Sequence, residues 1–451
     1  MKTNRVIKIF LASSEELEAD RYRFGNLIRK LDNIYEKRGI RIELFEWEDY
    51  DAAYNGMRKQ DEYNERVRAS DMFLALFHKK AGKFTIEEFN IARKAFDEQA
   101  SPKIYTYIKD LEAGESESRE LAEFKRLMLE ELGHYWCRYS NFDTMQLHFV
   151  LQLQMVEATT PIKVEVKESQ VKIGDSTIAD LNNVPFTSEN TTHKELKSRK
   201  EQLDREIGNA ESGGRRGFFG QRSRTTDEEL ANLRAERESV TEQIERQEKA
   251  LVDTAMSIAR MQGGECSSRM RTAAELFEKG ETGKAEAVLK EDDMEADATN
   301  AKLKFDTAAQ PTAELARNIE RCAGEYMLKA RIVISGIADE SRYLKAAKLM
   351  STAIDLVSGR LPEETLAEYL FDYAVLLTDA GQQTKALETW ERLSGIYERL
   401  YRKAPQKYAY GYAGVLNNMA VLYSNKGDFD HCLSKYLKAV DIYDRLDREE
   451  P

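Results

Sequence analysis

Proline and cysteine are both scarce in this chain. Of its 451 residues, seven are proline and four are cysteine. So few prolines argue against long disordered linkers. The cysteines are far apart and show none of the CxxC or Cys/His spacings of a metal site: Cys137, Cys266, Cys322 and Cys432. We therefore expect no structural metal, and buried thiols in a reducing, cytoplasmic environment.

Long apolar runs are also absent. No stretch approaches the length of about 18 residues that a membrane-spanning helix needs, and the apolar run near the amino terminus is too short for a signal peptide. Acidic residues outnumber basic ones, so the formal net charge is −12. Such a surface disfavours general binding to nucleic acid or to anionic membranes. The composition predicts a cytoplasmic protein without a membrane segment.

What the chain does contain is charge and helical periodicity. Charged residues make up 33% of it and hydrophobic residues 41%. At this length more than one hydrophobic core is expected. The patterning predicts an α/β plus all-α protein in four segments: an α/β domain over 1–158, a β-hairpin linker over 159–190, an antiparallel helical hairpin (coiled coil) over 191–262 and helical repeats over 263–451.

Short apolar segments alternate with amphipathic ones in the first domain. Four of them are expected to be strands: Val6–Ala12, Ile40–Trp47, Asp71–His78 and Lys103–Lys109. Helices between strands imply a parallel sheet covered on both faces. Ser13 and Glu16 have the spacing of a capping box at the first helix. Sheets of this kind bind ligands outside the carboxyl ends of their strands, so the segments that follow the first three strands are the candidate rim.

The next two segments differ in the spacing of their apolar residues. Apolar and polar residues alternate with a period of two on both sides of Gly174-Asp175, and this pattern predicts a β-hairpin. Apolar residues at spacings of three and four between Leu230 and Ile258, with a shorter facing seam between Leu196 and Ile207, predict two antiparallel helices. The tip between them, "ESGGRRGFFGQRSR", is basic and aromatic and could touch nucleic acid. A solvated tip or a protein contact is the favoured interpretation, so nucleic acid is an unlikely partner.

The carboxyl-terminal segment repeats with a period of 46 residues. Ala374, Leu377, Gly381, Ala386 and Trp390 align with Ala420, Tyr423, Gly427, Cys432 and Tyr436. A weaker copy begins at Ala273, and a degenerate one is expected over 342–354. Small residues let paired helices approach closely, and a glycine makes the turn between them. The pattern predicts an α-solenoid.

Two adjacent acids begin a predicted helix in "GKFTIEEFNIARKAF". With Thr85 as the N-cap, the helical wheel places Glu87 in solvent. Glu88 falls at the edge of a buried stripe formed by Ile86, Phe89, Ala92 and Phe96. A carboxylate held at such an edge can have its pKa tuned, as catalytic carboxylates do. The alternative is that Glu88 only completes a capping box with Thr85.

Residues 4–155 resemble a Toll/interleukin-1 receptor (TIR) domain, through "KIFLASSEEL", "FEWEDYD" and "SDMFLALFHKKAGKFTIEEFNIARKAF". NAD-cleaving members of that family carry an aromatic residue four positions before the catalytic glutamate and an alanine four after it. Here these positions are Phe84, Glu88 and Ala92. The resemblance implies a flavodoxin-like fold in which Glu88 is catalytic. The other residues that it implies for the substrate site are Leu11, Ser13, Ser14, Trp47, Asp49, Tyr50 and Phe84. Ala12 departs from the family's serine-rich run, and Phe84 replaces a frequent tryptophan.

The 46-residue pattern resembles tetratricopeptide repeats, most clearly over Asn417–Tyr443, although that family's usual period is shorter. Together the two resemblances imply an anti-phage NADase of bacterial immunity that takes NAD⁺ as its substrate and needs no cofactor or metal. They also imply activation by homo-oligomerisation through the TIR and helical regions, or by a protein trigger bound to the repeats. Two alternatives stay open: a non-enzymatic, self-associating adaptor, and another N-glycoside enzyme such as a nucleoside deoxyribosyltransferase.

Overall fold

The computed structural model describes most of the chain. The described residues are 5–37, 39–46, 59–132, 134, 136–156, 164–213, 227–261, 266–336 and 341–449. They form two compact units. The first comprises residues 1–150, 163–165 and 170–184, and the second comprises 151–162, 166–169 and 185–451.

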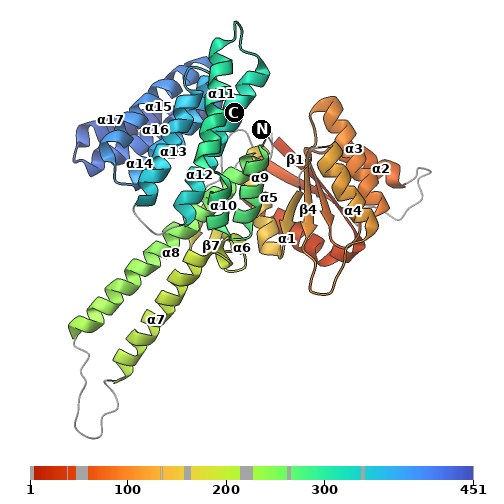
Figure 1. Cartoon of the computed structure of the whole chain (residues 1–451), viewed down its shortest axis with the longest axis horizontal. Helices are drawn as coiled ribbons and strands as arrows, with labels where there is room; N and C mark the ends of the chain where they lie inside the picture. Colours follow the sequence, from red (N-terminus) through yellow and green to blue (C-terminus); the bar gives the residue numbers. More distant parts are fainter. Residues whose placement is uncertain are drawn as a thin grey trace. The chain divides into compact units, whose positions relative to one another are not determined.

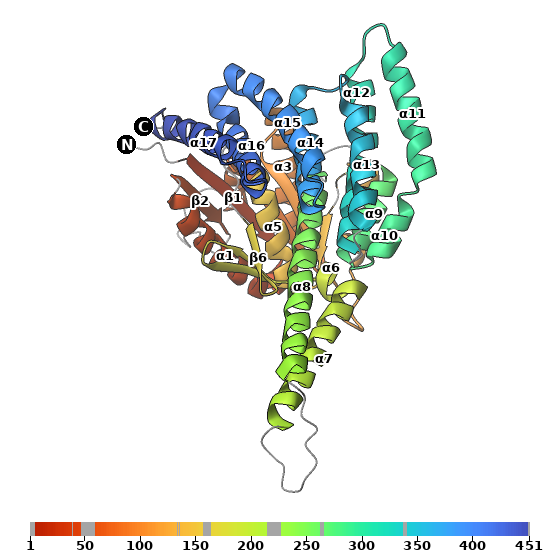
Figure 2. The ribbon, with the colours of Figure 1, turned by 90° about the vertical axis from the view of Figure 1, so that its left-hand side faces the viewer.

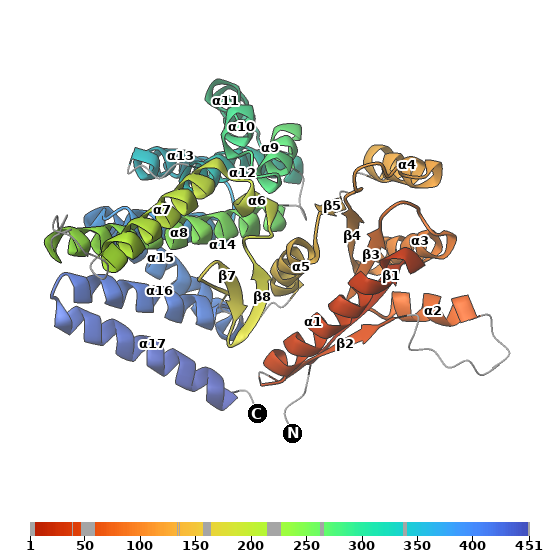
Figure 3. The ribbon, with the colours of Figure 1, turned by 90° about the horizontal axis from the view of Figure 1, so that it is seen from below.

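The first unit is built on a five-stranded parallel sheet (Figure 3). Its strands are β1 (Arg5–Ser13), β2 (Ile40–Phe45), β3 (Met72–Phe77), β4 (Lys103–Lys109) and β5 (Trp136–Tyr139). Their order is β2-β1-β3-β4-β5, which is the flavodoxin-like arrangement. The four predicted strands are confirmed. The fifth strand was not predicted, because its four residues are too few to show a clear pattern.

Helices cover both faces of this sheet, as the parallel arrangement requires. One face carries α1 (Glu18–Glu36) and the first part of α5 (Phe142–Val156), where Phe24 meets Phe149 edge-on at 4.7 Å between ring centroids. The other face carries α2 (Lys59–Arg68), α3 (Lys83–Gln99) and α4 (Arg119–Arg126). On that face Phe89 of α3 meets Phe124 of α4 at 5.1 Å.

The start of α1 differs from the prediction. Ser13 is the last residue of β1, and a short 3₁₀ turn (Glu15–Leu17) precedes the helix, which begins at Glu18. Ser13 and Glu16 therefore form no capping box, because neither lies at the required helix position. The helix ends at Glu36, and Gly39 takes a left-handed φ of 76°, which glycine adopts readily just after a helix.

A small antiparallel element follows the α/β sheet. It consists of β6 (Val164–Lys167), β7 (Gln170–Ile173) and β8 (Ser176–Asp180). The predicted hairpin is confirmed, with Gly174-Asp175 as the turn between β7 and β8 and Gly174 at a φ of 56°. The turn between β6 and β7 was not predicted. There Glu168 and Ser169 both take left-handed φ angles, of 53° and 57°, which are characteristic of a type I′ turn.

The second unit begins with α6 (Pro185–Ser188) and a helical hairpin formed by α7 (Thr191–Gly213) and α8 (Asp227–Met261) (Figure 1). Leu203 of α7 packs against Val240 and Ile244 of α8, so the predicted antiparallel seam is confirmed. The basic tip between the two helices lies outside the described residues. None of the helices that the structure describes has the length and apolar character needed to cross a bilayer.

The rest of the second unit is a row of paired helices (Figure 2). They are α9 (Ser268–Glu278), α10 (Thr282–Val288), α11 (Glu291–Thr307), α12 (Ala313–Gly336), α13 (Ser341–Val357), α14 (Glu363–Asp379), α15 (Gln383–Lys403), α16 (Pro405–Asn425) and α17 (Phe429–Glu449). Gly381 and Gly427, the predicted turn glycines, have left-handed φ angles of 68° and 75°. A side chain with Cβ would be strained there, which explains the glycines.

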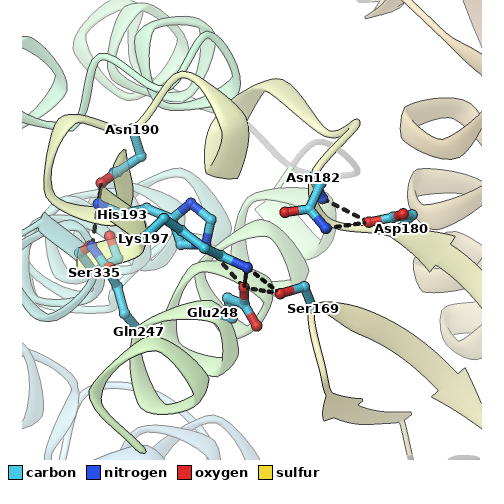
Figure 4. A network of polar contacts seen from close by, with 9 residues as sticks. All are labelled: Ser169, Asp180, Asn182, Asn190, His193, Lys197, Gln247, Glu248 and Ser335. Carbon is cyan, nitrogen blue, oxygen red and sulfur yellow. Dashed lines mark hydrogen bonds and ion pairs between the residues drawn. The ribbon is translucent and has the colours of Figure 1, made fainter. Parts of the chain in front are cut away.

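A buried polar cluster joins the β6–β7 turn to α7 and α8 within this unit (Figure 4). The Glu248 carboxylate is fully buried, and its Oε1 accepts hydrogen bonds from Ser169 Oγ at 2.7 Å and from His193 Nε2 at 2.9 Å. Lys197 Nζ lies 3.5 Å from the same oxygen. Burial alone would raise the pKa of Glu248, but the bonds from His193 and Ser169 outweigh it and lower that pKa.

Candidate active site at the carboxyl edge of the sheet

The helix that carries Glu88 begins three residues earlier than predicted. Gly82 is the N-cap of α3, and its carbonyl accepts the Ile86 N–H at 3.0 Å. Thr85 is thus the third residue of the helix and not its cap. The capping-box interpretation of Glu88 is therefore wrong, because a cap must precede the first helical residue.

Glu88 lies on the inward side of α3. Its side chain is 7% exposed, and the buried residues of the helix form one stripe: Thr85, Glu88, Phe89, Ala92 and Ala95. Phe96, expected in that stripe, is 44% exposed instead. Because α3 follows β3, its first turns stand at the carboxyl edge of the sheet. A largely buried carboxylate is thus held at the edge where such sheets bind ligands.

Glu87 was expected to be fully solvated, and this is wrong. It is half-buried, and its Oε1 accepts a hydrogen bond from Asn64 Nδ2 of α2 at 3.3 Å. The two glutamates still differ, since Glu87 faces a neighbouring helix and Glu88 belongs to the sheet-facing stripe.

The end of β1 supplies three of the predicted substrate contacts. Phe10 and Ala12 share a core cluster with Phe89 on the α3 side of the sheet. Leu11, which is 1% exposed, points to the opposite face because strand side chains alternate. Any contact of Leu11 with a ligand beside Glu88 must therefore use its backbone. Ser13 and Ser14 come next, where the strand ends.

Arg21 of α1 holds these two serines. Its guanidinium is 2% exposed, and Nη1 donates to Ser13 Oγ at 2.9 Å and to the Ser14 carbonyl at 2.8 Å. Ser14 itself is 7% exposed, and its Oγ donates to Glu16 Oε1 at 3.2 Å. The segment after β1 is therefore held by charge-assisted hydrogen bonds within the protein.

Two further bonds connect this segment to the loop after β3. Glu16 Oε1 also accepts the backbone N–H groups of Lys79 at 3.1 Å and Lys80 at 3.4 Å. The same loop contacts the segment after β4, because Lys79 Nζ lies 2.5 Å from Glu115 Oε1. The bond from Lys79 lowers the pKa of Glu115. Three loops at the carboxyl edge are thus joined by backbone hydrogen bonds to Glu16 and by the Lys79–Glu115 ion pair.

A second buried charge on α1 was missed by sequence reasoning. Asp20 is 4% exposed and accepts hydrogen bonds from Lys109 Nζ at 2.9 Å and from the Tyr139 hydroxyl at 3.0 Å. Burial, with Asp20 nearby, raises the pKa of Tyr139. A signal was available, because Asp20 and Arg21 continue the three-and-four spacing of Phe24, Leu27, Ile28 and Leu31 along the buried side of α1.

The remaining predicted contacts are less constrained. Phe84 is on the first turn of α3 and is 57% exposed, so its ring is available to a ligand. Trp47, Asp49 and Tyr50 lie outside the described residues. The structure thus places Glu88, Ser14 and Phe84 on segments that meet at one edge, while the side chains of Leu11 and Ser13 are engaged elsewhere.

His134 lies behind α3 on the same face. Its Nε2 is 3.0 Å from Thr106 Oγ1 of β4, and its ring meets that of Phe89 at 5.6 Å. Burial lowers the pKa of His134 to about 4. A neutral imidazole is therefore part of the packing that supports α3 near Glu88.

The helical unit has a pocket of its own. It has a volume of about 740 Å³ and is formed by α8, α12, α13 and α14. Arg331 Nη2 lies 2.6 Å from Asp372 Oδ1 on its wall. Burial raises the pKa of Asp253, although Arg331 and Lys249 oppose that shift. The pocket is large enough for a side chain or short segment of a partner.

No known protein family matches this chain, and none of the curated proteins matches it either. Any function assigned to the chain therefore rests on its own residues and their geometry.

Proposed function

We propose that the first unit is a TIR-like domain that hydrolyses NAD⁺ to nicotinamide and an ADP-ribose product, with Glu88 as its catalytic carboxylate. The observation that carries the proposal is the 7% exposure of Glu88 on the sheet-facing side of α3, at the carboxyl edge of a β2-β1-β3-β4-β5 sheet. The spacing of Phe84, Glu88 and Ala92 supports it, as does the exclusion of a capping role.

The chemistry requires a carboxylate close to the ribose of the substrate. As the bond between ribose C1′ and the nicotinamide nitrogen breaks, nicotinamide leaves with the bonding electrons and C1′ gains oxocarbenium character. The negative charge of Glu88 stabilises that cation and orients the ribose hydroxyls. Water, or an adenine nitrogen in a cyclising reaction, then bonds to C1′, and a proton is released.

The loops around Glu88 supply pre-organisation. The Arg21 contacts hold the segment after β1, and the Glu16 contacts hold it beside the loop after β3. A rim that is fixed before the substrate arrives loses less conformational entropy on binding. Phe84 offers an exposed aromatic face on which a nicotinamide ring can stack.

The second unit is proposed to be a tetratricopeptide-like sensor. Its paired helices and turn glycines support this, and its pocket offers a recess for a protein trigger. In the proposed account, the enzyme is activated when the chain assembles into homo-oligomers or binds its trigger through the repeats.

The test is nicotinamide release by the purified full-length chain over a range of protein concentrations, followed by chromatography. Parallel reactions contain NAD⁺ or a panel of purine and pyrimidine nucleosides. We expect nicotinamide from NAD⁺, at a rate per chain that rises with protein concentration. Intact NAD⁺ in a demonstrably assembled protein would favour the adaptor. Base exchange among nucleosides would favour a deoxyribosyltransferase.

A further inference from the structure

The pocket of the helical unit is lined in part by apolar side chains. Met350 of α13 is 1% exposed and Leu376 of α14 is 4% exposed, so both are almost fully buried, whereas Leu344 of α13 is 61% exposed. The volume of about 740 Å³ lies in the range of sites that enclose a small ligand or a long side chain. A group with an apolar stem therefore fits the inner part of the pocket.

The pocket is also lined by three acidic and three basic side chains: Arg246, Lys249, Asp253, Arg331, Asp372 and Asp379. Two of the three basic groups are already engaged by carboxylates. Arg331 Nη2 lies 2.6 Å from Asp372 Oδ1, and Arg246 Nη2 lies 3.0 Å from Glu242 Oε2. These ion pairs leave little of the two guanidinium charges for a ligand.

The other three charged groups are not engaged in this way. No ion pair or side-chain hydrogen bond joins Asp253, Asp379 or Lys249 to another of the described residues. Two carboxylates and one ammonium group leave an excess of one negative charge in the pocket. A ligand with one positive charge would balance it.

Asp253 is the carboxylate that most needs such a ligand. It is partly buried, and burial raises its pKa even though Arg331 and Lys249 oppose that shift. The positive charge of the surrounding residues therefore does not compensate the loss of hydration at Asp253. A cation that donates hydrogen bonds to this carboxylate would do so.

We propose that the pocket binds one arginine or lysine side chain of a protein partner. Such a side chain combines an apolar stem, which would contact Met350 and Leu376, with a cationic head group for Asp253 and Asp379. The exposed Leu344 beside it offers an apolar contact to the neighbouring residues of the partner, which a free small cation lacks. A polypeptide is therefore favoured over a small cation.

This inference specifies the chemistry of the protein trigger, so it rests on the sensor role proposed for the second unit. It does not depend on the catalytic assignment of Glu88.

Lys249 distinguishes a cationic ligand from an anionic one. Its ammonium group acts to lower the pKa of both Asp253 and Asp379, so it lies near both carboxylates. It is exposed, and it would repel an incoming cation and attract an incoming anion. Loss of its charge should therefore strengthen the binding of a basic peptide and weaken the binding of an acidic one.

The test is the binding of fluorescently labelled peptides to the purified full-length chain, measured by fluorescence anisotropy. The probe is a capped heptapeptide with a central arginine between leucines, and its counterpart has glutamate at the centre. We expect the arginine peptide to bind at least tenfold more tightly than the glutamate peptide. n-Butylguanidinium has the same head group without a peptide backbone, and it should compete at least tenfold less well than the unlabelled arginine peptide.

Four variants test the residues that are proposed to bind the head group. Asp253→Asn should weaken binding of the arginine peptide at least tenfold, and Asp379→Asn, at an exposed position, about threefold. Lys249→Gln should strengthen it about threefold. The matched control is Asp355→Asn, which makes the same change of charge at an exposed position of α13 outside the pocket and should leave binding unchanged. Circular dichroism checks that each variant is folded.

Several results would overturn the proposal. Tighter binding of the glutamate peptide, or weaker binding of the arginine peptide to Lys249→Gln, would indicate an anionic ligand. Equal competition by n-butylguanidinium would assign the pocket to a small cation. Equal binding of the arginine peptide to the wild type and to folded Asp253→Asn would place the peptide elsewhere, and no binding up to about 1 mM would remove the site. None of these measurements uses NAD⁺, so failure of the pocket assignment and failure of the enzyme are distinguished.

Discussion

At the scale of single residues, the first unit buries several groups that ordinarily stay in water. Glu88, Asp20 and Arg21 are 7%, 4% and 2% exposed. Asp20 and Arg21 have hydrogen-bond partners at strand ends and in the segment after β1, and these bonds compensate the loss of hydration. All three charged groups lie towards the carboxyl edge of the sheet, where sheets of this topology bind ligands.

His134 gives a first prediction at this scale. Its pKa is about 4 in the folded protein and about 6.5 in an unfolded chain, so the unfolded state binds the proton first as pH falls. We expect the folded protein to lose about 2 kcal/mol of stability between pH 7 and pH 5 through this group. The loss should be absent in His134→Gln and unchanged in His431→Gln, an exposed control.

The measurement is urea unfolding of the three proteins at both pH values, with the His134 ring followed by NMR. A resonance that titrates near pH 6.5 would contradict the lowered pKa of His134.

Glu248 gives a second prediction, because hydrogen bonds, and not burial, lower its pKa in the folded protein. Its folded pKa is lowered, so its contribution to stability is present above the unfolded pKa of about 4.5 and is lost as pH falls through the folded value. At pH 7, Glu248→Gln should lower the free energy of unfolding by about 2–4 kcal/mol, because His193 and Ser169 lose a charged acceptor. Denaturant unfolding of Glu238→Gln, at an exposed position of α8, is the control and should change little. Equal stability of the two variants would contradict the cluster's role.

At the scale of elements, the β6–β7 turn is strained in a way that can be relieved. Glu168 is exposed and has a φ of 53°, a conformation that costs most residues about 1 kcal/mol and that asparagine tolerates. We expect Glu168→Asn to raise stability by about 0.5–1 kcal/mol in thermal unfolding, and Glu168→Ala to give no such gain. Destabilisation by asparagine would mean that the turn is not of type I′.

The elements also show where sequence reasoning succeeds. The first four strands and the Gly174-Asp175 turn were predicted, because burial on both faces and turn stereochemistry leave strong local signals. The start of α3 was not, because Thr85 has the chemistry of a cap while the backbone of Gly82 makes the turn. A cap depends on backbone angles that neighbouring loops impose.

The candidate site also has one part that the sequence could predict and one part that it could not. Glu88 could be selected from helical periodicity, since its inward position depends only on residues of its own helix. The contacts of Arg21 with Ser13 and Ser14, and of Glu16 with Lys79, could not, because they join segments that only the folded chain brings together. Local pattern identifies the carboxylate, whereas tertiary contacts build its surroundings.

At the scale of the whole molecule, substrate binding should protect a defined part of the chain. In a Glu88→Gln protein that retains NAD⁺, we expect slower hydrogen exchange over 9–14 and 78–92, the segments at the carboxyl edge, because binding stabilises only the state that holds the ligand. Residues 363–449 should be unaffected. Protection confined to the helical repeats would place the nucleotide in the second unit and contradict the proposed site.

The most direct test of the central claim is nicotinamide release by the wild type, Glu88→Gln and Glu87→Gln, compared at one protein concentration and with equal folded fractions. The account predicts that Glu88→Gln lowers the rate by about 10²–10³-fold, because it removes the charge that stabilises the transition state. Glu87→Gln, one residue away and bonded to Asn64, should keep a rate close to that of the wild type. Full activity of Glu88→Gln would contradict the account.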